Sequence, residues 1–85
     1  MKLTELESSF SSIQEDEKFI IDTMAELYSE RIKKGISQKE LSKRIGMPQP
    51  QLAKLEALDS LPTLKTLNRY AKGLGFELSI ELISA

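Results

Sequence analysis

The sequence predicts a mainly α-helical protein: a bundle of four to five helices followed by one C-terminal β-strand. Three observations predict this fold. Apolar residues recur at helical spacing through most of the 85-residue chain. Capping residues precede the helical segments, and glycines follow them. Near the C-terminus the spacing changes to strict alternation, which is typical of a half-buried strand. A chain of this length forms one domain at most, residues 1–85.

The first helix is expected to begin near residue 15. Ser12 and Glu15 have the spacing of a capping box, so residues 1–14 are predicted to be an N-terminal arm, flexible at its start. Gly35 follows two lysines and is expected to end the helix. The apolar stripe of this helix comprises Ile13, Ile20, Met24, Leu27 and Ile32, widened by Phe19, Ile21 and Tyr28.

Two short helices follow, in residues 37–56. Ser37 and Glu40 form a second capping box, and Gly46 ends the helix that it opens. The next helix begins around Pro48 and Pro50. Proline removes no helical hydrogen bond there, because the first N–H groups of a helix have no partner within it. The inner positions of the two helices are Leu41, Ile45, Leu52 and Leu55.

A fourth helix is predicted after the loop "DSLP". Thr63 is expected to cap it, and Gly73 and Gly75 to terminate it. Its inner face comprises Leu64, Leu67, Ala71 and Leu74. Residues 15–75 are therefore expected to form the helical bundle.

Residues 76–83 carry the strand pattern. The apolar residues of one face are Phe76, Leu78, Ile80 and Leu82. A lone strand leaves backbone N–H and C=O groups unpaired, so it needs a partner. A second copy related by a two-fold axis is the simplest partner, which makes these four residues a candidate dimer interface. The alternatives are a frayed tail and a strand packed alone on its own helices.

Charge is segregated along the chain although the net charge is only −1. Residues 1–30 carry a net −6, residues 31–54 a net +6, and residues 55–85 a net −1. A basic centre favours a nucleic-acid partner. The alternative is that these charges only solvate helix faces.

The sequence lacks the residues that several classes of function require. Without cysteine or histidine there are no disulfides, no Cys/His zinc site and no histidine catalysis. No glycine-rich phosphate loop or converging pair of acids occurs either. We therefore expect no enzyme, no cofactor and no metal. The absence of cysteine fits a reducing cytoplasm, and no apolar run is long enough to span a membrane.

Residues 30–56 resemble the XRE-type helix-turn-helix family of the lambdoid phage repressors, in the stretch "ERIKKGISQKELSKRIGMPQPQLAKLE". The segment "PTLKTLNRYAKGLG" resembles the helix that follows in that family. The resemblance covers about residues 24–75. The matching positions are Arg31, Gly35, Ser37, Gln38, Leu41, Gly46, Gln49, Leu52, Leu55 and Glu56. A bacterial or phage origin is expected from it.

The resemblance implies double-stranded DNA as a partner, with a palindromic operator. The second helix of the motif would enter the major groove, with Gln49, Gln51 and Lys54 facing base edges or adjacent phosphates. Gln38 would bind a phosphate. Further candidate phosphate contacts are Lys39, Lys43 and Lys65, for which a solvated surface charge is the alternative.

Two features of the resemblance concern structure. Arg31 and Glu56 match a buried salt bridge of relatives. The loop 57–59 departs from the family, which usually has a glycine and then a basic residue there. Asp59 would repel phosphate, and Leu58 is not expected to adopt left-handed geometry.

The order of the elements also resembles HigA-type and HipB-type antitoxins. This implies a dimer that represses its own operon and neutralises a protein toxin. The acidic residues 1–30 favour a basic ribonuclease of the RelE/HigB type as that toxin. The alternative is a stand-alone transcriptional repressor without a toxin partner.

Overall fold

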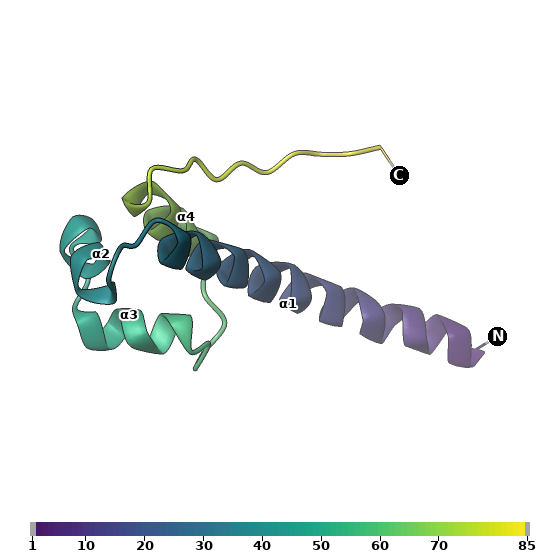
Figure 1. The fold of residues 1–85 in the computed structure, drawn as a ribbon. Helices are drawn as coiled ribbons and strands as arrows, with labels where there is room; N and C mark the ends of the chain where they lie inside the picture. Colours follow the sequence, from purple (N-terminus) through teal and green to yellow (C-terminus); the bar gives the residue numbers. More distant parts are fainter. Residues whose placement is uncertain (1, 85) are drawn as a thin grey trace.

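Four helices and an extended tail make up the computed structural model, which describes the backbone of residues 2–84 and the side chains of residues 16–84. The helices are α1 (Lys2–Lys33), α2 (Gln38–Ile45), α3 (Gln49–Glu56) and α4 (Leu64–Gly73). The C-terminal half of α1 packs with α3 and α4, while α2 bridges α3 and α4. The N-terminal half of α1 projects away from this bundle, and the tail leaves α4 on the same side of the molecule (Figure 1). The predicted mainly helical class is confirmed.

The start of α1 differs from the prediction. The helix begins at Lys2, and Ser12 lies within it rather than at its N-terminus. Residues 2–33 contain no glycine or proline, so the capping motif at Ser12 competes with an uninterrupted run of residues that tolerate helix. The expected inward position of Ile13 lies outside the described side chains. The division into an arm and a bundle stays a prediction.

The predicted caps of α2 and α4 are confirmed. Ser37 Oγ accepts a hydrogen bond from the backbone N–H of Glu40 at 3.0 Å, and Thr63 Oγ1 accepts one from the N–H of Thr66 at 3.1 Å. Each cap satisfies a backbone donor that has no partner within its helix.

A residue in the left-handed region follows the last residue of each helix by one or two positions: Gly35, Gly46, Leu58 and Gly75. Leu58, at φ 56°, overturns the expectation that it avoids this geometry. The N–H of Leu58 donates to the carbonyl of Leu55 at 3.1 Å, and that of Asp59 donates to Lys54 at 3.2 Å, as in a Schellman motif. The half-buried Leu58 side chain also packs on the core. These interactions offset a backbone cost of about 1–2 kcal/mol.

The core lies where the four helices meet. Its buried residues are Met24, Leu27, Leu41, Met47, Leu52, Leu67, Tyr70, Ala71 and Leu74. Five residues of the expected apolar stripes are exposed instead: Phe19 at 61%, Ile32 at 53%, Leu64 at 47%, Tyr28 at 43% and Ile21 at 39%. Ile32 stands beside the inner face of α1, which Arg31 occupies, and Leu64 is the first residue of α4. The inner face of α4 continues at Tyr70, a position that the sequence pattern missed.

Gly73 ends α4 in a role that differs from the predicted one. It is the last helical residue, and the left-handed turn is made by Gly75. A Cβ atom on Gly73 would lie 2.4 Å from Cγ2 of Ile45 and 2.7 Å from Cδ1 of Leu41. Gly73 therefore lets α4 approach α2 closely.

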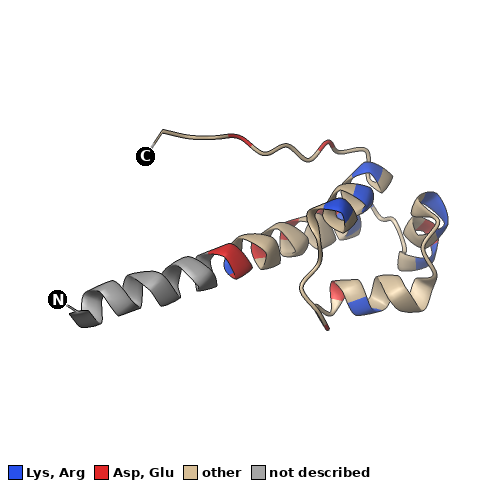
Figure 2. Ribbon diagram, turned by 180° about the vertical axis from the view of Figure 1, so that it is seen from behind, with Lys and Arg blue, Asp and Glu red and all other residues tan. Residues whose placement is uncertain are grey.

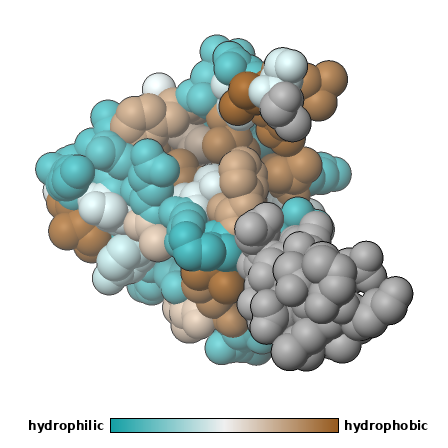
Figure 3. Space-filling view, turned by 90° about the vertical axis from the view of Figure 1, so that its right-hand side faces the viewer, coloured by the Kyte–Doolittle hydropathy of each residue, from teal (hydrophilic) through white to brown (hydrophobic). Residues whose placement is uncertain are grey.

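The tail shows no β-strand among the residues that the structure describes. Leu78 packs against the core cluster, and Nζ of Lys34 lies 4.9 Å from the ring centroid of Phe76. Farther along, Ile80 is 65% exposed and Leu82 is fully exposed. Apolar side chains therefore gather on the outer surface of the tail region (Figure 3). Within the described residues, no helix is both long and apolar enough to cross a membrane.

Candidate nucleic-acid interface

The helices α2 and α3 and the turn between them form a helix-turn-helix unit. The N–H of Met47 donates to the carbonyl of Ser42 at 3.0 Å, and the Met47 side chain is buried. Arg69 of α4 braces the same turn from outside. Its Nε donates to the carbonyl of Ile45 at 2.9 Å, and its Nη2 donates to that of Gly46 at 2.8 Å. The sequence pattern did not single out Arg69, because only the fold brings it to this turn.

The prolines fix the start of α3. Pro48 is the N-cap, and its carbonyl accepts hydrogen bonds from the N–H groups of Gln51 and Leu52, both at 3.0 Å. Pro50 lies in the first turn, where a missing N–H costs little. Gln49 and Gln51 are consequently presented in the first turn of α3, at an exposed helix end.

The side chains of Gln49, Gln51 and Lys54 are all exposed. Leu52 of the same helix is completely buried. Gln51 and Lys54 line a groove between α3 and the first turn of α4, with Leu61 and Thr63 on its other side. The outer face of α3 is thus polar and open to solvent.

A buried polar network fixes the inner end of this face. Arg31 donates two hydrogen bonds to the carboxylate of Glu56, from Nε to Oε2 at 2.8 Å and from Nη2 to Oε1 at 3.0 Å. Both side chains are less than 10% exposed. Arg31 also donates to the carbonyl of Ile36 at 2.8 Å and lies over the ring of Tyr28. Tyr70 donates its hydroxyl hydrogen to Oε2 of Glu56 at 2.5 Å.

The network shifts the pKa values of its members. Burial by itself would raise the pKa of Glu56, but hydrogen bonds from Arg31, Tyr70 and Gln38 lower it below its ordinary value. Burial would likewise lower the pKa of Arg31, and the bonds to Glu56 and Tyr70 raise it instead. Burial and the Glu56 carboxylate both raise the pKa of Tyr70. At neutral pH the network therefore contains the Glu56 carboxylate, the Arg31 guanidinium cation and the neutral Tyr70 phenol.

Gln38 connects this network to the exposed end of α3. Its Nε2 donates to Oε1 of Glu56 at 3.0 Å, and its Oε1 accepts from Nε2 of Gln49 at 3.3 Å. The structure thus brings together four of the sequence-predicted site residues, Arg31, Gln38, Gln49 and Glu56. Gln38 is half-buried at the N-terminus of α2.

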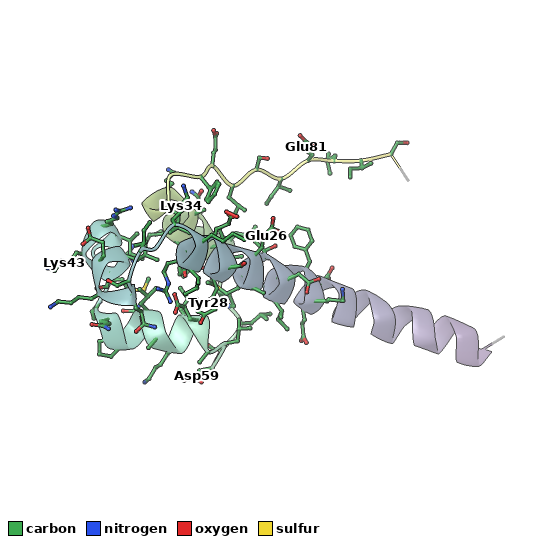
Figure 4. The ribbon with its side chains drawn as sticks, viewed as in Figure 1. Glu26, Tyr28, Lys34, Lys43, Asp59 and Glu81 are labelled. Carbon is green, nitrogen blue, oxygen red and sulfur yellow. The ribbon has the colours of Figure 1, made fainter. Side chains whose placement is uncertain are left out.

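The candidate phosphate-binding lysines, Lys39, Lys43 and Lys65, are all exposed. Lys43 points outward from α2, and Asp59 lies in the loop beyond α3 (Figure 4). Basic residues mark α2, α3 and α4, while acidic residues follow one another along α1 (Figure 2). Among the described side chains, no group of acidic residues is arranged to hold a metal ion.

Residues 27–80 match the family model described as "Helix-turn-helix". This match covers most of the chain. It includes α2 and α3, which form the helix-turn-helix unit, and α4, which packs on α2. The chain belongs to the helix-turn-helix family. Proteins of this XRE-type family are DNA-binding regulators of transcription rather than enzymes.

This helix-turn-helix chain is also similar to a protein of Haemophilus influenzae that is named an uncharacterized HTH-type transcriptional regulator. The two are 42% identical over 55 residues, which cover 65% of this chain. The match spans 56% of the length of that relative. No solved structure matches the chain.

Proposed function

We propose that this protein binds double-stranded DNA sequence-specifically as a dimer and regulates transcription, with α3 in the major groove. One observation carries the proposal: α3 exposes Gln49, Gln51 and Lys54, while Leu52 and Glu56 of the same helix are held in the core. An exposed polar helix face on a rigid support is the arrangement with which a helix-turn-helix protein reads base edges.

The exposed side chains suit this task. A glutamine amide has a donor and an acceptor side by side, so it can bond N7 and N6 of adenine together. Lys54 can bind a guanine edge or a nearby phosphate. We propose that Lys39, Lys43 and Lys65 contact phosphates, and that Pro50 offers only apolar contact, for which a thymine methyl group is suitable.

The first experiment selects binding sites from a pool of randomised duplex DNA and then measures affinity against salt concentration. Each phosphate contact should steepen the fall in log affinity by about 0.9 per decade of salt. Lys43→Ala should reduce this slope by about one. Lys18→Ala, on α1 and paired with Asp22, is the matched control and should leave it unchanged. Affinity that does not depend on salt would contradict the proposal.

The second experiment tests base reading. Gln49→Ala should cost about 1–3 kcal/mol of discrimination at one base pair of the selected site. Affinity for sites that already carry a different base at that position should hardly change. An equal loss on every sequence would instead make Gln49 a residue that positions the protein on the backbone of the DNA.

A more specific proposal is that the protein is an antitoxin, which represses its own operon and neutralises a toxin. Its support is the acidic side of α1. A groove between α1 and the tail is lined by Glu26, Glu30 and Glu77 around an apolar floor that includes Leu27 and Leu78. An RNA-cutting enzyme must be basic to hold RNA, so a RelE/HigB-type ribonuclease would complement this surface.

The antitoxin proposal is tested with the product of the neighbouring gene. If that gene encodes a small basic protein, co-expression should yield a stable complex and relieve its toxicity. Charge reversal at Glu26 and Glu30 should weaken the complex, while charge reversal at the exposed Glu40 of α2 serves as the control. If the neighbour does not bind, a stand-alone repressor in the cytoplasm of a bacterial or phage-infected cell is the function that we propose.

A further inference from the structure

The turn between α2 and α3 is short of backbone hydrogen-bond donors. The carbonyl of Ile45 lies three positions before Pro48, and that of Gly46 lies four positions before Pro50. These are the spacings at which helical turns are bonded, but proline has no N–H to donate. No side chain caps α3 either, whereas α2 and α4 each have a side-chain cap. The end of α2 and the start of α3 therefore need donors from another part of the chain.

Arg69 of α4 supplies two donors to this turn. Its Nε donates to the carbonyl of Ile45 at 2.9 Å, and its Nη2 donates to that of Gly46 at 2.8 Å. One planar guanidinium thus joins two successive carbonyls. A lysine at this position could not do the same, because its ammonium is a compact point charge without the fixed fork of arginine. The positive charge also suits the C-terminal end of α2, where the helix dipole is negative.

We propose that Arg69 is a positioning residue for DNA reading, which holds the turn so that the first turn of α3 keeps its place. The inference rests on the proposed DNA-binding function. Only the buried Met47 separates the braced Gly46 from Pro48. The carbonyl of Pro48 in turn accepts the first hydrogen bonds of α3, from the N–H groups of Gln51 and Leu52. A residue of α4 that need not touch a base would thus control how α3 presents its glutamines.

A loosened turn would weaken specific binding in particular. The first turn of α3 would have to be ordered when it meets the base edges, and this loss of entropy lowers the affinity for a specific site. Non-specific binding depends on charge rather than on base contacts, so it does not carry this loss. Arg69 should therefore control the specificity ratio, which is the affinity for the selected site divided by the affinity for unrelated DNA.

The test compares changes at Arg69 with the same changes at Arg44. Arg44 is the matched control, because it lines the same hollow between α2 and α4 but donates to the carbonyl of Gly73, at 3.3 Å, instead of to the turn. We expect Arg69→Ala and Arg69→Lys to lower the specificity ratio about 2- to 30-fold, the range that the loss of a helix cap implies. Arg44→Ala and Arg44→Lys should leave the ratio unchanged.

The lysine variant separates positioning from phosphate binding. Arg69→Lys keeps the charge, so the dependence of affinity on salt should stay as in the wild-type protein while the specificity ratio falls. A phosphate contact would give the opposite pattern. Arg69→Lys would then keep the ratio, and Arg69→Ala would reduce the slope of log affinity against log salt by about one. That pattern would overturn the inference.

A second substitution restores a local cap. Pro48→Ser introduces a backbone N–H and a side-chain oxygen that can cap α3. In the background of Arg69→Ala, it should recover most of the lost specificity ratio. In the wild-type background, where Arg69 already holds the turn, it should change the ratio little. An equal effect of Pro48→Ser in the two backgrounds would contradict the link between Arg69 and the start of α3.

Hydrogen exchange of the free protein tests the brace without DNA. In Arg69→Ala, the N–H groups of Gln51 and Leu52 should exchange faster relative to that of Leu67, which donates to Thr63 at the start of α4. In Arg44→Ala these relative rates should not change. Equal acceleration at all three positions in Arg69→Ala would show a general loss of stability and would overturn the positioning role. If the wild-type protein selects no DNA sequence, the proposed function fails, and hydrogen exchange still decides whether Arg69 holds the turn.

Discussion

Arg31 and Glu56 bring two charges into the interior of a small protein, and the network around them makes this tolerable. Two hydrogen bonds join the pair directly, and Tyr70, Gln38 and the carbonyl of Ile36 satisfy further polar atoms. No buried side-chain N or O atom among the described residues lacks a partner. Such a pair adds little net stability over a well-packed apolar pair, but removing one partner strands a buried charge.

Glu56→Ala should therefore destabilise the domain by about 3–5 kcal/mol, because Arg31 would remain buried without its counter-charge. Chemical denaturation followed by circular dichroism measures this free energy of unfolding. Asp22→Ala is the control: it breaks the exposed ion pair with Lys18 and should cost less than about 1 kcal/mol. Similar stability losses in the two variants would contradict the structural role of Glu56.

The lowered pKa of Glu56 also predicts a dependence of stability on pH. The unfolded chain takes up a proton at Glu56 near pH 4.3, whereas the folded protein does so only at lower pH. Between these values the unfolded state binds more protons, so stability falls as the pH drops from about 4.3 through the folded pKa. Denaturation curves at several pH values measure this. Glu56→Gln should flatten the dependence, and an unchanged dependence would show that other carboxylates cause it.

At the scale of the elements, Gly73 sets how closely α4 packs on α2. We predict that Gly73→Ala destabilises the domain by about 1–2 kcal/mol. The new Cβ atom would overlap Ile45 and Leu41 and cost about 1–3 kcal/mol, of which better helix propensity offsets up to about 1. Thermal unfolding measures the change. In the background of Ile45→Ala, which removes the closest contact, Gly73→Ala should reduce stability by less. An equal loss of stability in the two backgrounds would show that overlap with Ile45 is not the cause.

The elements were predicted from the sequence where local chemistry decides them. Ser37 and Thr63 cap as expected, because a cap depends on residues only three positions apart. Leu58 and Gly73 were misjudged for the opposite reason. The left-handed turn at Leu58 is held by packing on the core, and the role of Gly73 depends on side chains of α2. Among the site residues, Gln38 and Gln49 were identified, but their mutual hydrogen bond and the brace from Arg69 required the fold.

At the scale of the whole molecule, the tail divides into two parts with different surroundings. Phe76 and Leu78 lie against Lys34 and the core. Ile80 and Leu82 stand beyond the bundle with most of their surface exposed. The four residues alternate with polar ones, so a second copy could pair with the tail as a strand and cover the exposed pair. We propose this as the dimer interface.

Ile80→Lys should then weaken the dimer without unfolding the domain, since Ile80 contributes little to the core of one protomer. In a two-fold dimer the substitution occurs twice. At about 1.5 kcal/mol for each buried isoleucine, the dissociation constant should rise about 100-fold or more. Sedimentation equilibrium measures it, and circular dichroism checks the fold. Ser79→Lys, on the other face of the same strand, is the matched control and should keep the dimer.

Because two half-sites are read together, Ile80→Lys should also lower affinity for a palindromic site far more than for a single half-site. A wild-type protein that remains monomeric on its selected DNA would contradict the interface.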